Sequence, residues 1–147
     1  MNATELLKRQ HREVKGLFRA LKNARDARGR RAAMEKIATQ LSAHMRIEED
    51  IFYPALQDIG TKKAEEMVPE AYEEHHVASL VLVELPDVDP KDERFEAKMT
   101  VLEELIEHHV EEEEKDLFKL AEKLGAERLI ELGEEMKDAF EVEVAKH

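Results

Sequence analysis

The sequence contains no cysteine, so it offers no disulfide framework, no thiolate metal site and no cysteine nucleophile. Turn-forming residues are also scarce, with 5 glycines and 4 prolines among 147 residues, and aromatic residues make up only 5%. Leucine, alanine, glutamate, lysine and methionine dominate instead, and these residue types favour helices over a strand-rich fold. The length is that of a single domain with a continuous core, and we predict one all-α domain over residues 1–147.

Long apolar runs and excess positive charge are missing too. No run approaches the ~20 residues of a membrane span and the N-terminus has no signal-peptide pattern, so we expect a cytoplasmic protein without a membrane partner. The formal net charge of −12 would repel a nucleic-acid backbone, so no nucleic-acid partner is expected. The absence of a Gly-x-Ser-x-Gly motif and of a glycine-rich phosphate loop argues against ordinary hydrolase chemistry.

What the sequence does contain is helical periodicity, with apolar residues recurring at spacings of three, four and seven. Thr4 is predicted to cap the first helix, the run from Arg25 to Arg31 to form a charged turn, and Pro54 to kink or end the second helix. Pro69 suits the first position of the third helix, after a short helix or turn, and Gly125 is predicted to stop the fourth. The five predicted helices cover residues 4–21, 33–52, 70–85, 95–124 and 126–144.

Four long helices with short connections predict an antiparallel up-down four-helix bundle over about residues 4–124. The C-terminal helix, 126–144, is expected to pack on the outside or the end of this bundle. Counted from a turn near Arg28, His11 lies 17 residues before it and His44 lies 16 residues after it. These two histidines should therefore lie at similar height on neighbouring helices.

The third and fourth helices fit this geometry less well. Counted from Val88, His75 lies 13 residues back and His109 lies 21 residues forward, a mismatch of roughly 12 Å at 1.5 Å per residue. The linker over residues 86–90 therefore has to climb back along the bundle, which leaves the start of the fourth helix overhanging.

Histidine and glutamate side chains fall in phase with the apolar stripes of the four long helices. Residues four apart project from one helical face, so each His-x-x-x-Glu pair is a preformed unit of two ligands. Imidazole nitrogen with carboxylate oxygen suits Fe, Mn or Zn, and helix bundles often hold two metals between facing helices. If both glutamates bridge, the protein supplies eight coordination contacts and leaves positions open for a small ligand. The candidate ligands are His11, His44, Glu48, His75, His109 and Glu113.

Simpler interpretations compete with this one at each residue. A single His-x-x-x-Glu pair is most often solvated, and most of the acidic run Glu111–Glu114 should face water. The doublets His75–His76 and His108–His109 leave the register open, although phase with the apolar positions favours His75 and His109. Glu49, Glu112 and His76 are candidates to orient a ligand imidazole. Tyr53 and Tyr72 are candidates to lie near the site, although the spacing fixes no role for either. Di-zinc hydrolase chemistry and a bundle with purely structural histidines remain alternatives.

Taken in chain order, His11, His44-x-x-x-Glu48, His75 and His109-x-x-x-Glu113 resemble the hemerythrin-like (HHE cation-binding) domain family. The resemblance covers roughly residues 4–124 and implies a four-helix bundle. It also implies two iron ions in a non-haem, oxo- or hydroxo-bridged di-iron centre, with Glu48 and Glu113 as bridges and the four histidines as terminal ligands. Members of the family bind or process O2, peroxide or nitric oxide, or sense oxygen and iron.

Two departures from the oxygen-carrying members narrow the function that the resemblance implies. Ser79 stands where those proteins have a further histidine, and His109-x-x-x-Glu113 replaces a His-x-x-x-x-Asp pattern. One iron would then have fewer protein ligands, which favours peroxide or nitric oxide detoxification over O2 carriage. We therefore expect catalase-like peroxide disproportionation or nitric oxide scavenging, by a monomer or homodimer. The alternative is an iron- or oxygen-sensing module without turnover.

Overall fold

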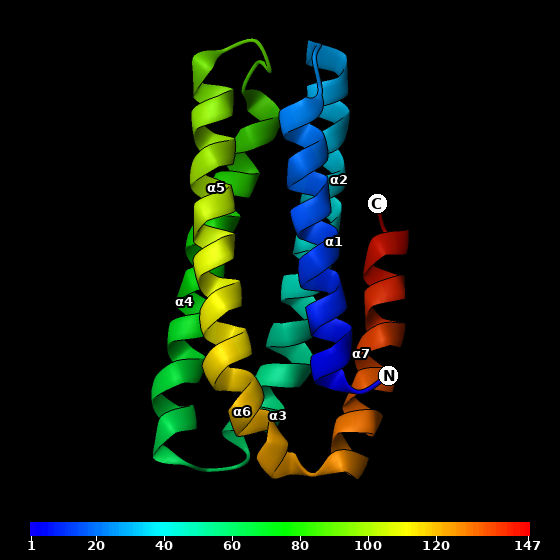
Figure 1. The fold of residues 1–147 in the computed structure, drawn as a ribbon, viewed down its shortest axis with the longest axis vertical. Helices are drawn as coiled ribbons and strands as arrows, with labels where there is room; N and C mark the ends of the chain where they lie inside the picture. The colour runs from blue at the N-terminus through cyan, green and yellow to red at the C-terminus, as the bar shows by residue number, and fades with distance from the viewer.

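Four long antiparallel helices form the body of the molecule, and all residues from 1 to 147 are described by the computed structural model (Figure 1). The chain forms helices and turns but no strand, which confirms the predicted all-α bundle. The helices of the bundle are α1 (Ala3–Asn23), α2 (Ala27–Ile47), α4 (Lys62–Glu84) and α5 (Glu93–Glu112). No helix combines the length and the hydropathy needed to cross a bilayer.

Short helical segments complete the second and fourth predicted helices. After α2 come a π turn, η1 (Glu48–Phe52), and the short helix α3 (Tyr53–Gln57). After α5 come a second π turn, η3 (Glu113–Leu117), then α6 (Phe118–Ala121) and the 3-10 turn η4 (Glu122–Leu124). The regular hydrogen bonding of the second helix therefore changes at Glu48, before Pro54 is reached.

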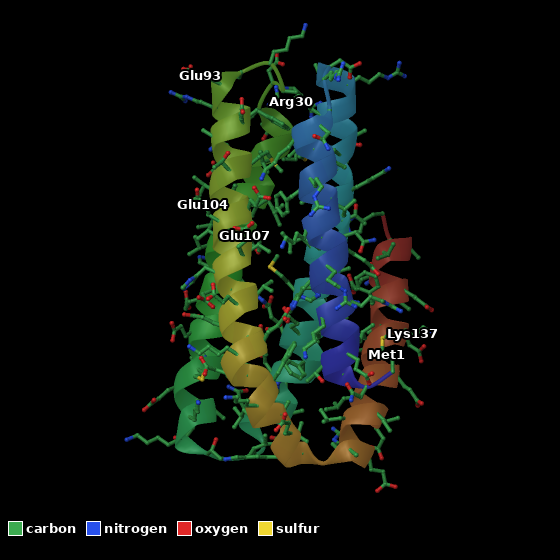
Figure 2. The ribbon with its side chains drawn as sticks, viewed as in Figure 1. Met1, Arg30, Glu93, Glu104, Glu107 and Lys137 are labelled. Atoms are coloured by element: carbon green, nitrogen blue, oxygen red, sulfur yellow. The ribbon has the colours of Figure 1, made fainter.

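The fifth helix, α7 (Ala126–Ala145), packs along α1 and α2 (Figure 1). Its buried apolar positions include Leu129, Leu132 and Met136, which belong to the same core cluster as the start of α1. Gly133 faces the N-terminal segment so closely that a Cβ atom there would lie 2.3 Å from the Met1 carbonyl oxygen. Figure 2 shows Met1 beside Lys137 of α7 at this contact. One side of the α1–α2 pair is thus covered, as predicted for the additional helix.

The first two helix starts differ from the predicted ones. Asn2 rather than Thr4 caps α1, because the Glu5 amide donates to Asn2 Oδ1 (3.0 Å) while the Asn2 amide donates to Glu5 Oε1 (3.1 Å). The second helix begins at Ala27, within the predicted charged turn, because Asp26 Oδ1 accepts from the Gly29 amide at 2.7 Å.

The predicted start of the third helix at Pro69 is wrong, because α4 is continuous from Lys62 and carries Pro69 inside it. Thr61 caps the helix through its hydroxyl, which accepts from the Ala64 amide at 3.2 Å. An internal proline costs a helix roughly 3 kcal/mol, since one amide donor is lost and the ring crowds the preceding turn. Ala64, Val68 and Ala71 are buried around this site, so packing against the bundle offsets a cost that local sequence cannot.

The linker between α4 and α5 resolves the predicted height mismatch. A 3-10 turn, η2 (Leu85–Asp87), extends α4, and the following residues rise to the start of α5 at the end of the bundle (Figure 1). The Arg31 guanidinium donates to the carbonyl oxygens of Pro86 (3.2 Å) and Val88 (3.3 Å), which ties the linker to α2. His75 and His109 are thereby brought to the same level.

A single polar layer divides the apolar core. Two apolar clusters lie on either side of it; along α1, Leu7 belongs to one cluster, Val14 to the other, and His11 lies between them. The buried polar and charged residues all belong to this layer: Gln10, His11, His44, Glu48, His75, His109 and Glu113. Burying so many polar groups is costly unless each has a partner, which points to a specific role for the layer.

Candidate metal centre

All six residues predicted as ligands are brought together in the polar layer, and both glutamates are fully buried. The two register questions are answered, because His75 and His109 point into the bundle while His76 and His108 face solvent. The acidic run divides as phase predicted, with Glu113 inside and Glu111 and Glu114 exposed. Helical phase therefore located each inward side chain correctly.

Both His-x-x-x-Glu pairs lie across a change from α-helix to π turn. His44 is in the last turn of α2 and Glu48 begins η1, and in the same way His109 is in the last turn of α5 and Glu113 begins η3. A π turn inserts an extra residue into the helix, and such turns are frequent at functional sites. The sequence showed no sign of this widening beyond the repeated His-x-x-x-Glu-Glu pattern.

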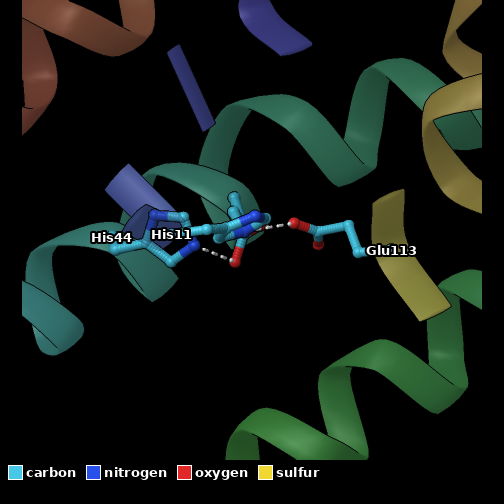
Figure 3. Close-up of side chains that lie close together, drawn as sticks. His11, His44 and Glu113 are labelled. Atoms are coloured by element: carbon cyan, nitrogen blue, oxygen red, sulfur yellow. Dashed lines mark ion pairs between the residues drawn. The ribbon is translucent and has the colours of Figure 1, made fainter. Parts of the chain in front are cut away.

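The first group of candidate ligands joins α1, α2 and the two π turns. His11 Nε2 lies 3.0 Å from Glu113 Oε1, and His44 Nε2 lies 3.3 Å from Glu48 Oε1. Figure 3 shows the two imidazoles turned toward carboxylate oxygens. The ligand atoms of these four residues all lie within 4.8 Å of one another, close enough to surround one metal ion.

The second group joins α4, α5 and the same carboxylates. Glu48 Oε1 lies 3.1 Å from His75 Nε2, and Glu113 Oε2 lies 3.4 Å from His109 Nε2. The two imidazoles approach each other to 3.1 Å between their Nε2 atoms. Each glutamate therefore lies between the two histidine pairs, as a bridging carboxylate would.

Tyr53, a candidate neighbour of the site whose role the spacing left open, contributes an oxygen to the second group. Its hydroxyl donates to Glu113 Oε2 at 2.6 Å and lies 3.3 Å from His75 Nε2 and 3.1 Å from His109 Nε2. These separations match the one between the two histidine nitrogens. The Tyr53 oxygen is therefore placed among the candidate ligand atoms.

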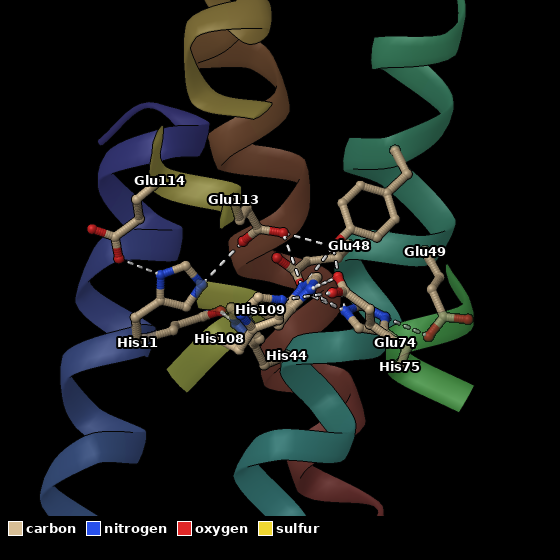
Figure 4. A network of polar contacts seen from close by, with 12 residues as sticks. His11, His44, Glu48, Glu49, Glu74, His75, His108, His109, Glu113 and Glu114 are labelled. Carbon is tan, nitrogen blue, oxygen red and sulfur yellow. Dashed lines mark hydrogen bonds and ion pairs between the residues drawn. The ribbon is translucent and has the colours of Figure 1, made fainter. Parts of the chain in front are cut away.

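The four histidines are oriented by a closed ring of hydrogen bonds around the bundle, and Figure 4 shows two of them, from His11 to Glu114 and from His75 to Glu49. Gln10 of α1 accepts from His44 Nδ1 at 2.6 Å, and Glu49 of η1 accepts from His75 Nδ1 at 3.0 Å. Each bond runs to the next helix, and each Nδ1–H···O contact leaves Nε2 directed at the centre.

The ring is completed by two carboxylates. Glu74 of α4 accepts from His109 Nδ1 at 2.8 Å, and Glu114 of η3 accepts from His11 Nδ1 at 2.7 Å. Of the predicted orienting residues, Glu49 takes this role, whereas Glu112 and His76 do not. The residues missed share one signal, since each acceptor directly precedes or follows a candidate ligand in the sequence.

At three of the imidazoles, pairing with carboxylates raises the pKa more than burial lowers it. Burial lowers the pKa of His75, but its contacts with Glu48 and Glu49 more than compensate and raise that pKa to about 9. Burial also lowers the pKa of His11 and His109, and contact with the Glu113 carboxylate leads the interactions that raise both above the usual value. A metal ion must displace protons from these rings in order to bind.

Glu113 and Tyr53 respond to the same buried charges in opposite directions. Burial raises the pKa of Glu113, but contacts with Glu48, His109 and His11 outweigh it and hold that pKa well below its usual value. Burial, followed by the negative charges of Glu113 and Glu48, raises the pKa of Tyr53 well above the ordinary value. The carboxylate is therefore ionised while the phenol keeps its proton.

Four atoms at the centre are buried and make no hydrogen bond, although their neighbours are close. They are His11 Nε2, Glu48 Oε1, Glu48 Oε2 and Glu113 Oε1. A buried carboxylate with unsatisfied oxygens is strongly disfavoured in a folded protein unless a cation compensates it. The donor set of imidazoles and carboxylates, without sulfur, fits Fe, Mn or Zn.

Comparison with known proteins agrees with this arrangement. Residues 2–121 match the family model for the hemerythrin HHE cation binding domain. Over 119 residues, covering 80% of this chain and 71% of the relative, the sequence is 29% identical to uncharacterized protein Rv2633c of Mycobacterium tuberculosis. A DNA nickase of Nostoc is 25% identical over 118 residues, which cover 80% of this chain but 33% of that protein.

A solved structure is similar over nearly the whole chain. The crystal structure of a hemerythrin HHE cation binding domain-containing protein from Mycobacterium kansasii, a homolog of Rv2633c, has a TM-score of 0.86 at 29% identity. The similarity covers 99% of this chain and 89% of that one, so it includes the fifth helix. The chain therefore belongs to the hemerythrin HHE cation-binding domain family, and the histidine–carboxylate layer is its candidate metal site.

Proposed function

We propose that this layer binds two iron ions and that the protein disproportionates peroxide, according to 2 H2O2 → 2 H2O + O2. The observation that carries the proposal is the position of Glu48 and Glu113, each placed between two histidine pairs and each with buried oxygens that lack a hydrogen bond. Two groups of ligand atoms that share carboxylates suit a pair of metal ions, as helix bundles with inward carboxylates commonly hold.

The residues divide between the two ions as follows. His11 and His44 would hold one, His75 and His109 the other, and Glu48 and Glu113 both. Tyr53 would supply an additional oxygen to the second ion, since its hydroxyl lies as near to the two histidine nitrogens as they lie to each other. The Tyr53 oxygen would then partly replace the ligand that is missing because Ser79 stands in place of a histidine.

A pair of iron ions, each changing by one electron, would supply the two electrons that reduce one peroxide to water and take back two electrons from a second peroxide as it is oxidised to O2. The chain supplies the surroundings. The ring of acceptors holds each Nε2 toward the centre, and in the metal-free chain the Tyr53 hydroxyl holds a proton 2.6 Å from Glu113 Oε2. The apolar clusters on both sides keep bulk water out of the layer.

The space beside the centre suits a very small substrate. A cavity of about 10 Å³ is lined by the four inward histidines and by apolar residues, among them Val14, Ile106 and Val110. A cavity of that size is at the lower limit for one water molecule, so peroxide, O2 or nitric oxide would fit only with slight adjustment.

Metal analysis combined with turnover tests the proposal. Iron-reconstituted protein should contain two iron ions per chain, show ferric charge-transfer absorption that changes on adding azide, and release O2 from peroxide. His109→Ala should lose metal and O2 release, whereas His76→Ala, at an exposed histidine outside every ligand cluster, should retain both.

Two results would contradict the proposal in different ways. Reconstituted protein with no bound iron would exclude the metal centre. Protein with two iron ions but no O2 release would exclude disproportionation and leave a sensing module; a spectral response to nitric oxide with its consumption would favour scavenging instead.

A further inference from the structure

A second cluster of ligand-type side chains lies on the outer side of α4 and α5. His108 Nε2 lies 3.1 Å from Glu112 Oε1 and 3.9 Å from Glu74 Oε2. One ligand atom from each of these residues lies within 4.8 Å of the others. His108 and Glu112 repeat the His-x-x-x-Glu spacing one residue out of phase with His109 and Glu113, so α5 presents one such pair inward and one outward.

Glu74 belongs to the outer cluster and to the ring around the buried centre. Its Oε1 accepts from His109 Nδ1 at 2.8 Å, while its Oε2 faces His108 (Figure 4). The carboxylate is partly exposed, and the His108 side chain is 65% exposed. A single side chain therefore connects solvent with a candidate ligand of the centre.

The outer cluster is not a by-product of the internal repeat of the bundle. His44 and Glu48 repeat as His109 and Glu113, and by the same offset His108 and Glu112 correspond to Ala43 and Ile47. Ala43 and Ile47 are buried, on the half of the bundle that α7 covers. The equivalent positions on α5 are polar and open to solvent, so a cluster of ligand-type side chains occurs at α5 and not at the equivalent part of α2.

We propose that Glu74, His108 and Glu112 form a solvent-facing site for a divalent cation of the Zn²⁺ type, connected to the buried centre through Glu74. One imidazole and two carboxylates suit such cations, with water completing the coordination. Two negative carboxylates face one imidazole here, so a dication balances the charge of the cluster. The connection to the centre rests on the proposed function, whereas the outer site does not.

A bound cation would change the buried centre in a definite direction. Withdrawing charge from Glu74 weakens its hydrogen bond to His109 Nδ1–H and makes that imidazole a poorer electron donor. The ferric state at the second ion is then less stabilised, so the midpoint potential of the centre should rise when the outer site is filled.

Zn²⁺ titration of the iron-loaded protein, followed by calorimetry, tests the outer site. The protein should bind one Zn²⁺ per chain that is lost in both His108→Ala and Glu112→Gln. His76→Ala is the matched control. Like His108, His76 is the exposed member of a histidine doublet, but it belongs to no ligand cluster. Zn²⁺ binding that is absent, or equal in the protein and in His108→Ala, would overturn the proposal.

The connection through Glu74 has a separate readout. Zn²⁺ should raise the midpoint potential of the iron centre in the protein and in His76→Ala, but not in His108→Ala. An unchanged potential with Zn²⁺ bound would remove the connection and retain the site. If the chain takes up no iron, the proposed function fails, while the difference in Zn²⁺ stoichiometry between the protein and His108→Ala still decides the outer site.

Discussion

The centre has two halves, the first with His11 and His44 and the second with His75 and His109, which share a backbone arrangement but differ in chemistry. His11 and His75 each bond a carboxylate from a π turn, Glu114 and Glu49 respectively. In contrast, His44 bonds the neutral amide of Gln10.

The second half, with His75 and His109, has more carboxylate and hydroxyl groups around it than the first. His109 bonds the carboxylate of Glu74, and Tyr53 packs beside His75 with its hydroxyl in the centre. The residue equivalent to Tyr53, five after the glutamate of its own motif, is Phe118, which stacks on His11 with ring centroids 6.0 Å apart. The difference teaches that an internal repeat can place two histidine pairs alike and still surround them with different charges and hydrogen-bonding groups.

The largest effect should come from removing what the halves share. Glu48→Ala deletes a carboxylate placed between both histidine pairs, so metal content after reconstitution should fall close to zero. His44→Ala should instead lose mainly the metal of the first half. Metal analysis distinguishes the two results, with the exposed variant Glu111→Ala as control; full metal content in Glu48→Ala would show that the halves bind independently.

Exchanging the ring acceptors should reverse the difference between the halves. Glu74→Gln gives the second half a neutral acceptor, and loss of such a partner typically weakens metal binding about 10–100-fold. Gln10→Glu should strengthen binding in the first half. The rates of iron release to a chelator measure both effects, and the exposed Glu104→Gln on α5 (Figure 2) serves as control. Equal release rates in the two ring variants would contradict the comparison.

Tyr53→Phe should make the second half resemble the first. If Tyr53 binds iron, its phenolate-to-iron absorption band disappears while the metal is retained. In the metal-free chain, Glu113 Oε2 loses its donor, which should lower the free energy of unfolding by about 1–3 kcal/mol. Tyr72→Phe is the matched control, since Tyr72 packs against Tyr53 but donates to the Glu49 carbonyl instead. A band that survives in Tyr53→Phe would exclude ligation.

Disturbing the contact between α7 and the N-terminal segment should lower the stability of the fold. Gly133→Ala places a methyl group 2.3 Å from the Met1 carbonyl oxygen, and such overpacking should cost about 1–3 kcal/mol in denaturant unfolding. Gly16→Ala is the control, because nothing lies within 4 Å of its Cβ and α1 should gain helix propensity. An unaltered stability of Gly133→Ala would show that α7 is loosely held.

Without metal the two halves should no longer differ in metal binding, and the stability of the fold should instead depend on pH. A histidine with a raised pKa stabilises the fold fully below the unfolded pKa and loses that contribution as the pH rises through the folded pKa. The metal-free chain should therefore lose stability as the pH rises from 6.5 to about 9, the pKa of His75. Denaturant unfolding across this range, with iron-loaded protein as reference, checks the trend; a rising stability would contradict it.

The sequence by itself determined the helices of the bundle and the inward position of the six candidate ligands. Apolar residues repeat with the period of a helix, so phase alone separates His109 from His108 and Glu113 from its acidic neighbours. The metal content, the cytoplasmic location and the monomeric or homodimeric state stay predictions.

Only the tertiary structure decided which side chains meet across helices. The acceptor ring, the hydroxyl of Tyr53 in the second half and the outer cluster around Glu74 all depend on how neighbouring helices are rotated and offset. Pro69 lies inside α4 for a related reason, since burial outweighs a local preference. Periodicity reports the face of one helix, whereas these contacts are set by the packing of two or more.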